Sequence, residues 1–185
     1  MKTPEGFFDF QDPFDIMVGL WSGMTTSFDE HGHYESSVAS LVRISWVKKD
    51  EILHYQQKEL ANLDQALRGN PRKEVLANII SHDFSMAVEG KACHSVKVKG
   101  EKLSMKGVET RPGVYLFHLT FPQGDYYNNQ IYAGANERHI IGPFVPKGRG
   151  RAFNCVVSQT FTRISYDPDF VRKGRMEDRL LRKRK

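Results

Sequence analysis

The sequence predicts an all-β protein: a single antiparallel up-and-down β-barrel of about ten strands, with a short N-terminal helix and a short helical insertion near residues 60–80. Two observations lead to this fold class. Short segments with strand-like alternation are separated at close, regular intervals by turn residues, which is typical of sandwiches and barrels. Most of these segments are joined as hairpins, and closing such a sheet removes its unpaired edges.

The first elements follow from local signals. Asp12-Pro13 favours a short helix that runs from Pro13 to about Met17, because Asp caps a helix and Pro fits its first turn. A first strand is expected from about Leu20 to Phe28, followed by a turn at Asp29-Glu30-His31-Gly32.

A long second strand, about His33–Val47, alternates between two rows of side chains, and a third strand covers Glu51–Glu59. The row of the second strand that we expect to face inward consists of Tyr34, Ser36, Val38, Ser40, Val42, Ile44 and Trp46.

The pattern changes between Leu60 and Ile80, where apolar residues recur at helical spacings and Gly69-Asn70-Pro71 interrupts them. This segment is either a helical insertion or strand and loop. We favour a helical turn at Asn62–Arg68 with an extended segment after it.

Strand signals then return, separated by turn sequences such as Glu89-Gly90 and Arg111-Pro112-Gly113. The expected strands are Asp83–Val88, Cys93–Val98, Lys102–Glu109, Val114–Phe121, Tyr126–Ala133, Arg138–Phe144 and Phe153–Tyr166.

The chain divides into a leader at 1–17, the barrel at 18–166 and a basic C-terminal tail at 167–185. From Arg172 to Lys185 the tail carries eight Lys or Arg and two acids, whereas the whole chain has a net charge of +5. The barrel is therefore near neutral, which argues against a basic nucleic-acid-binding face, and no specific nucleic-acid motif is present. The tail is either a solvated end or a contact for RNA, an acidic partner or an anionic membrane.

The N-terminal residues lack the apolar core of a signal peptide, and no run approaches the roughly 20 apolar residues of a transmembrane segment. Cys93 and Cys155 form neither a disulfide framework nor a zinc motif. We therefore predict a cytoplasmic protein with free thiols. Asp29, His31 and His33 surround one turn, but three convergent ligands are not indicated, so no metal site is predicted.

The leader, Gly19-Leu20-Trp21 on the first strand and Phe161-Thr162-Arg163 on the last strand together resemble the lipocalin and fatty-acid-binding (calycin) superfamily. The resemblance implies that Trp21 plugs one end of the barrel and that Arg163 packs across its indole. A guanidinium in that position adds cation–π attraction and covers apolar surface.

Two subfamilies are closer. Gly19–Gly23 followed by Phe28–Gly32 resembles divergent lipocalin-like proteins of photosynthetic microbes. Asn136–Arg138, Arg149–Arg151 and Ser158–Arg163 are loosely similar to the late strands of S-type bilin lyases, which attach chromophores to phycobiliproteins. The second likeness implies chromophore-lyase activity as an alternative.

A barrel interior lined by apolar residues and a few polar groups is the expected ligand site. If Arg163 faces the plug, the alternation of the last strand points Gln159 into the cavity. The ligand-binding candidates are Tyr55, Gln57, His118, Gln130, Tyr132, Gln159 and Arg151, and Asn128 is a further possible contact. His118 alternates with an apolar row, so its face stays open.

The basic loop Pro146–Arg151 is either a surface turn or a device that steers an anion toward the cavity. A ligand carboxylate would be met by Arg149, Arg151 or Arg43.

Catalytic chemistry is left open. His54, His94, His118 and His139 lie on different strands, and a His with a Tyr or Glu59 would form an acid–base pair inside the barrel. A haem would need one such His as axial ligand, and no spacing selects one. No cofactor is assigned.

Three functions remain: binding of a small, mainly hydrophobic and possibly carboxylate-bearing ligand; an isomerase, cyclase or bilin lyase that uses the same cavity; and an interaction module that acts through the basic tail. A homodimer is compatible with each.

Overall fold

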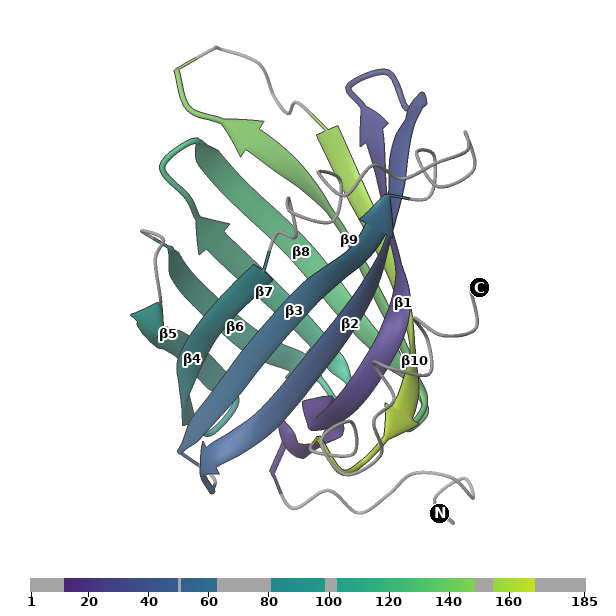
Figure 1. The fold of residues 1–185 in the computed structure, drawn as a ribbon. Helices are drawn as coiled ribbons and strands as arrows, with labels where there is room; N and C mark the ends of the chain where they lie inside the picture. Colours follow the sequence, from purple (N-terminus) through teal and green to yellow (C-terminus); the bar gives the residue numbers. More distant parts are fainter. Residues whose placement is uncertain (1–11, 50, 63–80, 99–102, 149–154, 169–185) are drawn as a thin grey trace.

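The computed structural model describes residues 12–49, 51–62, 81–98, 103–148 and 155–168, and they form one closed antiparallel barrel (Figure 1). Each strand pairs with its neighbours in sequence, and β1 closes the barrel against β10. The strands are β1 (Gly19–Asp29), β2 (Tyr34–Lys48), β3 (Ile52–Asn62), β4 (Ser81–Glu89), β5 (Ala92–Val98), β6 (Ser104–Arg111), β7 (Val114–Thr120), β8 (Gly124–Ala133), β9 (Glu137–Pro146) and β10 (Cys155–Ser165). The predicted all-β barrel is confirmed.

The two helical predictions differ from the structure. A single 3-10 turn, η1 (Asp15–Met17), replaces the helix expected from Pro13, although the Asp12 carboxylate accepts a hydrogen bond from the Phe14 N–H at 2.7 Å. β3 continues to Asn62, where a helical turn was expected to begin. The rest of that insertion, residues 63–80, lies outside the described residues.

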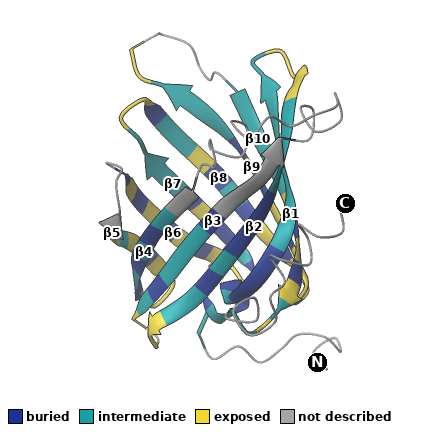
Figure 2. Ribbon diagram, in the orientation of Figure 1, coloured by how far each residue is buried: buried dark blue, intermediate teal, exposed yellow. Residues whose placement is uncertain are grey.

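From Ser40 on, the side chains of β2 follow the predicted inward row. Tyr34, which was also expected to face inward, is 52% exposed, and the register shifts between Ser27 and Phe28, the partner of Tyr34. Ser40, Val42 and Ile44 are fully buried, and Trp46 packs against the same core. Figure 2 shows buried residues concentrated toward the end of the barrel where η1 lies. We call this the plugged end.

The plugged end is built around Trp21. Its indole is fully buried, and its Nε1–H donates to the Met17 carbonyl at 2.9 Å, which ties η1 to the barrel. The Cζ atom of Arg163, which is opposite Trp21 in the β1–β10 register, lies 4.1 Å from the indole centroid.

The N–H groups of the Arg163 guanidinium donate hydrogen bonds to backbone carbonyls. Its guanidinium donates to the carbonyls of Ala135 at 2.6 Å and Ile16 at 2.5 Å, and also to Val18. Burial lowers the pKa of Arg163 to about 10, so the group is still charged at neutral pH. One side chain therefore joins η1, the β8–β9 turn and the first strand.

The backbone conformation and the close packing at residue 19 require glycine, and this explains the first position of the Gly-x-Trp sequence. The φ of Gly19 is +137°, and a Cβ added there would lie 2.5 Å from the Ser165 carbonyl oxygen and 3.0 Å from Arg163 Nη1. Only glycine fits this backbone and leaves room for the guanidinium.

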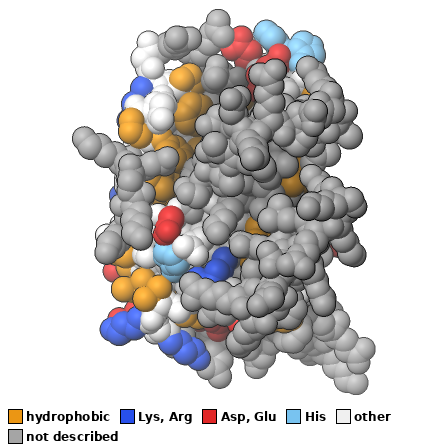
Figure 3. Space-filling model, viewed as in Figure 1, with side chains coloured by type: hydrophobic (Ala, Val, Ile, Leu, Met, Phe, Trp, Pro, Cys, Tyr) orange, Lys and Arg blue, Asp and Glu red, His pale blue; other side chains and the backbone are white. Residues whose placement is uncertain are grey.

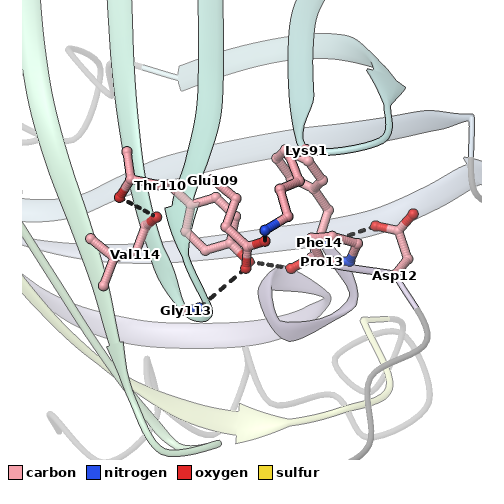
Figure 4. A network of polar contacts seen from close by, with 9 residues as sticks. Asp12, Pro13, Phe14, Lys91, Glu109, Thr110, Gly113 and Val114 are labelled. Carbon is pink, nitrogen blue, oxygen red and sulfur yellow. Dashed lines mark hydrogen bonds and ion pairs between the residues drawn. The ribbon is translucent and has the colours of Figure 1, made fainter.

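A buried carboxylate completes the plugged end (Figure 4). Glu109 accepts a hydrogen bond from the Gly113 N–H at 3.3 Å, and the Tyr115 hydroxyl lies 3.5 Å from its carboxylate. Lys91 Nζ is 3.9 Å from the same carboxylate, and Tyr115 also donates to the Pro13 carbonyl. These contacts fasten the leader to the β6–β7 hairpin.

Arg163→Ala is expected to lower the free energy of unfolding by about 3 kcal/mol, because three backbone carbonyls lose their donor and each unpaired group costs about 1 kcal/mol or more. Urea unfolding measures the loss. Arg111→Ala removes an exposed guanidinium from the end of β6 and serves as the control. A change for Arg163→Ala no larger than that of the control would contradict the structural role.

Candidate functional site

A cavity of about 90 Å³ lies inside the barrel beyond the plug. Its walls are mostly apolar, from Met17 at the plug to Leu103 and Phe121 farther along the barrel. The polar side chains that line it are Tyr55, Gln57, Tyr126, Asn128, Gln130, Arg138 and Gln159. A mainly apolar pocket with a few polar groups is the usual form of a small-molecule site.

Arg138 is the dominant polar group of the cavity. It comes second in β9, just after the β8–β9 turn, and only 1% of its surface is exposed. Its guanidinium carbon lies 5.3 Å from the Phe161 ring centroid, 5.6 Å from that of Tyr55 and 5.8 Å from that of Tyr132. The cation is thus surrounded by aromatic rings at the floor of the cavity.

The hydrogen bonding of Arg138 is incomplete. Nη2 donates to Gln130 Oε1 at 3.1 Å, but Nε and Nη1 are buried and find no acceptor among the described residues. No carboxylate in the described part of the chain forms an ion pair with it. A buried cation without a charged partner is energetically costly, and buried N–H groups are normally satisfied by a protein acceptor, ordered water, an ion or a ligand.

Arg138 stays charged in this environment. Burial lowers its pKa, but the neighbouring phenols of Tyr132 and Tyr55 raise it, and the net direction is upward. The cavity therefore presents a permanent positive charge with free N–H donors.

A chain of amides continues from Arg138 along β8. Gln130 accepts from Arg138 and donates through Nε2 to Asn128 Oδ1 at 3.2 Å. Gln130 and Asn128 are two residues apart and so share the inner face of the strand. These two hydrogen bonds fix the Gln130 carbonyl oxygen as the acceptor for Arg138 Nη2 and leave Nε and Nη1 of the guanidinium available.

Two further hydrogen-bonded pairs of polar side chains lie on β10, β1 and β3. Gln159 Nε2 donates to Thr25 Oγ1 at 3.1 Å, and the Tyr55 hydroxyl donates to Gln57 Oε1 at 2.7 Å. These side chains already have partners, whereas the Tyr126 and Tyr132 hydroxyls are buried without one among the described residues. Burial raises the pKa of Tyr132 to about 12 and that of Tyr126 still further, so both remain neutral hydroxyl donors.

The predicted site residues separate into distinct groups. Tyr55, Gln57, Gln130 and Gln159 line the cavity. Tyr132 points inward but lies beside the plug, where its ring meets the edge of Trp21 at a centroid distance of 5.6 Å. Arg151 and Arg149 lie outside the described residues.

His118 does not line the cavity. It lies on the outer face of β7, stacked on Tyr127 at a centroid distance of 4.4 Å, with Nε2 3.1 Å from Asp125. Because its neighbours Phe117 and Leu119 point inward, the pleat turns His118 to the outside.

The other histidines proposed for acid–base chemistry also lie on outer rows. His54 alternates with the inward-facing Leu53 and Tyr55, and its contacts are Ser85 and Asp83. His94 and His139 are exposed. None of His54, His94, His118 and His139 can serve as the interior base, or as the axial ligand of a haem in the cavity.

Arg43 is also excluded as the ligand cation. It belongs to the outer row of β2, where Nη1 donates to Ser45 Oγ at 3.2 Å and Nε to the Pro168 carbonyl at 3.1 Å. Its inward-facing neighbours are Val42 and Ile44.

Sequence reasoning missed Arg138 as the cavity cation. The residue was assigned to a strand, but β9 has an isoleucine on each row, Ile140 inside and Ile141 outside, so the alternation did not fix which row was buried. Arg138 could have been recognised as an inward-facing residue because it lies two residues before Ile140 and therefore on the same face of β9.

The cavity lining contains no His, Cys, Asp or Glu among the described residues, so its titratable groups are phenols and one guanidinium. Cys93, elsewhere in the core, has its pKa raised to about 12 by burial and is not activated. Asp29, Glu30, His31 and His33 gather instead at the β1–β2 turn, where Figure 3 shows acidic and histidine side chains together at the end of the barrel away from the plug.

Comparison with solved structures shows which proteins share this fold. No protein-family model matches the sequence, and no curated protein matches it. The S-type phycobiliprotein lyase CPES from Guillardia theta superposes with a TM-score of 0.60 at 10% identity, covering 81% of this chain and 89% of the lyase. A DUF3598 protein of unknown function from Nostoc punctiforme gives 0.57 at 11% identity over 88% of this chain.

The chain has a calycin-type barrel fold. It spans about half of the Nostoc protein, 52% of that chain. A third structure, EF1p2_mFAP2b bound to DFHBI, gives a TM-score of only 0.40 at 10% identity over 80% of this chain and 94% of the other, and supports no inference. At these identities the likeness is one of fold. In the described residues no helix has the length and apolar character needed to cross a membrane.

Arg138→Met is expected to leave the barrel folded and to raise the free energy of unfolding of the ligand-free protein by about 1 kcal/mol or more, because an apolar side chain of similar length replaces an unpaired buried charge. Urea unfolding of delipidated protein measures this change. A clear loss of stability would show that Arg138 is a structural residue.

Proposed function

We propose that this protein binds a small, mainly hydrophobic molecule that carries an anionic group, and that Arg138 receives that group at the floor of the cavity. The observation that carries the proposal is the buried guanidinium with two free N–H-bearing nitrogens and no carboxylate partner among the described residues. A carboxylate supplies the missing charge and accepts a charge-assisted hydrogen bond from one of these nitrogens.

The apolar walls of the cavity suit the hydrophobic part of such a ligand. Tyr55 and Phe84 form a stacked pair with ring centroids 4.8 Å apart, and Phe117 and Ile140 line the same space. Burial of apolar ligand surface contributes roughly 25 cal/mol per Å² before the ordering costs are subtracted.

The cavity volume limits the ligand. About 90 Å³ is less than the roughly 150 Å³ of an engineered cavity that takes up benzene, so a larger molecule requires wall side chains to move. Met17, Met86 and Met105 line the cavity, and methionine is the apolar side chain that repacks most easily. The three methionines therefore supply the adaptable part of the wall.

Bilin attachment is the alternative function. It is supported by the similarity in fold to a phycobiliprotein lyase, and a bilin carries carboxylates that would suit Arg138. The absence of an acid, a histidine or a thiol from the described cavity lining favours binding over chemistry. Bilin binding is therefore favoured over bilin attachment, and it requires the cavity of about 90 Å³ to open, because a bilin is far larger than benzene.

Octanoate and 1-octanol separate the charge contribution from the apolar contribution. We expect octanoate to bind at least about tenfold more tightly, since hydrogen bonds to a buried charge are worth about 1.5–3 kcal/mol. Isothermal titration calorimetry measures both affinities.

Arg138→Met should abolish the preference for octanoate while 1-octanol binds as before. His139→Ala, on the outer face beside it, is the matched control and should keep the preference. Equal affinities for the two ligands in the wild-type protein would reject the proposed role of Arg138. Biliverdin titrated under the same conditions, followed by its absorption spectrum, tests the tetrapyrrole alternative.

A further inference from the structure

The cavity contains a second open hydrogen-bonding position besides Arg138. Of the seven polar residues that line it, two carry buried polar atoms without a partner among the described residues: Arg138 and Tyr126. The other five hydrogen-bond to neighbouring side chains, and they are Tyr55, Gln57, Asn128, Gln130 and Gln159. The proposed function uses the Arg138 guanidinium and leaves the Tyr126 hydroxyl unexplained.

Tyr126 lies on the same wall as Arg138 but nearer the end of the barrel away from the plug. It is level with Phe144 in the β8–β9 register, whereas Arg138 is level with Tyr132, six residues farther along β8. At about 3.3 Å per residue this separation is roughly 20 Å along the strand. The two open positions therefore mark two depths of the β8–β9 wall.

The guanidinium and the phenol nevertheless interact. Burial raises the pKa of Tyr126, and the positive charge of Arg138 acts in the opposite direction. The side chains thus bring the two groups close enough for their charges to influence each other, although no hydrogen bond joins them. Burial has the larger effect, so the Tyr126 hydroxyl keeps its proton at neutral pH and is available as a donor.

The rest of the lining limits what the Tyr126 hydroxyl can receive. Arg138 is the only charged residue in the described lining, so a second anionic group on the ligand would be buried without a cation. The lining from β4 to just after β7 is wholly apolar and consists of Phe84, Met86, Leu103, Met105, Phe117, Leu119 and Phe121. An uncharged oxygen needs only the phenol as its donor.

We propose that the ligand is a monocarboxylic acid with a second, uncharged carbonyl oxygen, and that the Tyr126 hydroxyl donates a hydrogen bond to that oxygen. The inference rests on the proposed function, because Arg138 holds the carboxylate at the floor and the rest of the ligand then extends toward Tyr126. A carbonyl oxygen accepts a hydrogen bond without adding a donor that would need its own partner among the apolar walls.

Tyr126 acts in this arrangement as a specificity-determining residue. A plain hydrocarbon chain in front of it leaves the buried O–H unpaired, whereas an oxo group at the right carbon completes its hydrogen bond. A site that offers a hydrogen bond to one substituent discriminates against the analogue that lacks it. The cavity therefore selects an oxo acid over the unsubstituted fatty acid of the same length.

Isothermal titration calorimetry on the full chain tests the inference with octanoate and the four isomers from 4-oxooctanoate to 7-oxooctanoate. At least one oxo acid is expected to bind about three- to tenfold more tightly than octanoate, as one added neutral hydrogen bond warrants. Octanedioate, which carries a second carboxylate, is expected to bind more weakly than octanoate.

Tyr126→Phe should reduce the affinity for the favoured oxo acid to about that for octanoate. Tyr127→Phe is the matched control, since it makes the same change at the next, exposed residue of β8 and should keep the preference. Urea unfolding should show Tyr126→Phe at least as stable as the wild type, because the lost hydroxyl has no partner among the described residues.

The outcomes separate this inference from the proposed function. A wild-type protein that prefers octanoate to 1-octanol, but no oxo acid to octanoate, would overturn the inference and leave the proposed function standing. Equal affinities for octanoate and 1-octanol would reject both. An oxo-acid preference that survives in Tyr126→Phe, a clear loss of stability in that variant, or octanedioate that binds as tightly as octanoate would each overturn the inference.

Discussion

The packing of Arg163 on Trp21 is the constraint on which the rest of the barrel depends. It closes one end: the guanidinium packs on Trp21 of β1, and its hydrogen bonds reach η1, Val18 and the β8–β9 turn. Tyr132 packs against the edge of Trp21, and Arg138 lies against Tyr132. The plug is therefore also the floor of the cavity, and it determines where the interior guanidinium can stand.

The barrel contains two buried arginines whose bonding differs. The guanidinium of Arg163 donates to three backbone carbonyls and stabilises the closed end. That of Arg138 has one protein acceptor and two buried nitrogens without a partner in the described structure. Since burial costs both groups their hydration, the hydrogen bonds of the first are explained by the structure alone, whereas those of the second are the reason that we propose a ligand.

The barrel could be predicted from the sequence because the signals that specify it are local. Turn residues between short alternating segments define hairpins, and hairpins in series specify an up-and-down order without long-range information. Trp21 and Arg163 could be paired because a family likeness connected them. The strand bounds differ by only a few residues, since ladder pairing continues past the last clear alternation, as it does from Glu59 to Asn62 in β3.

The site was less predictable because it depends on the face to which each strand turns its side chains. Gln57 and Gln159 lie on rows whose phase is clear, and both line the cavity. His118 and Arg138 lie on strands with apolar residues on both rows, where period alone assigns no face. The exposed apolar side chains of β6–β9 removed the contrast that marks the inside of a strand, and this hid the cavity cation.

The most direct test of the account is the NMR signal of the Arg138 side chain. In protein labelled with ¹⁵N-arginine, the Nε–H resonance of Arg138, assigned by its loss in Arg138→Met, is followed as octanoate is added. The account predicts a large downfield shift of that proton, because the carboxylate accepts its hydrogen bond, and a small shift with 1-octanol. Octanoate that binds without moving the resonance would contradict it.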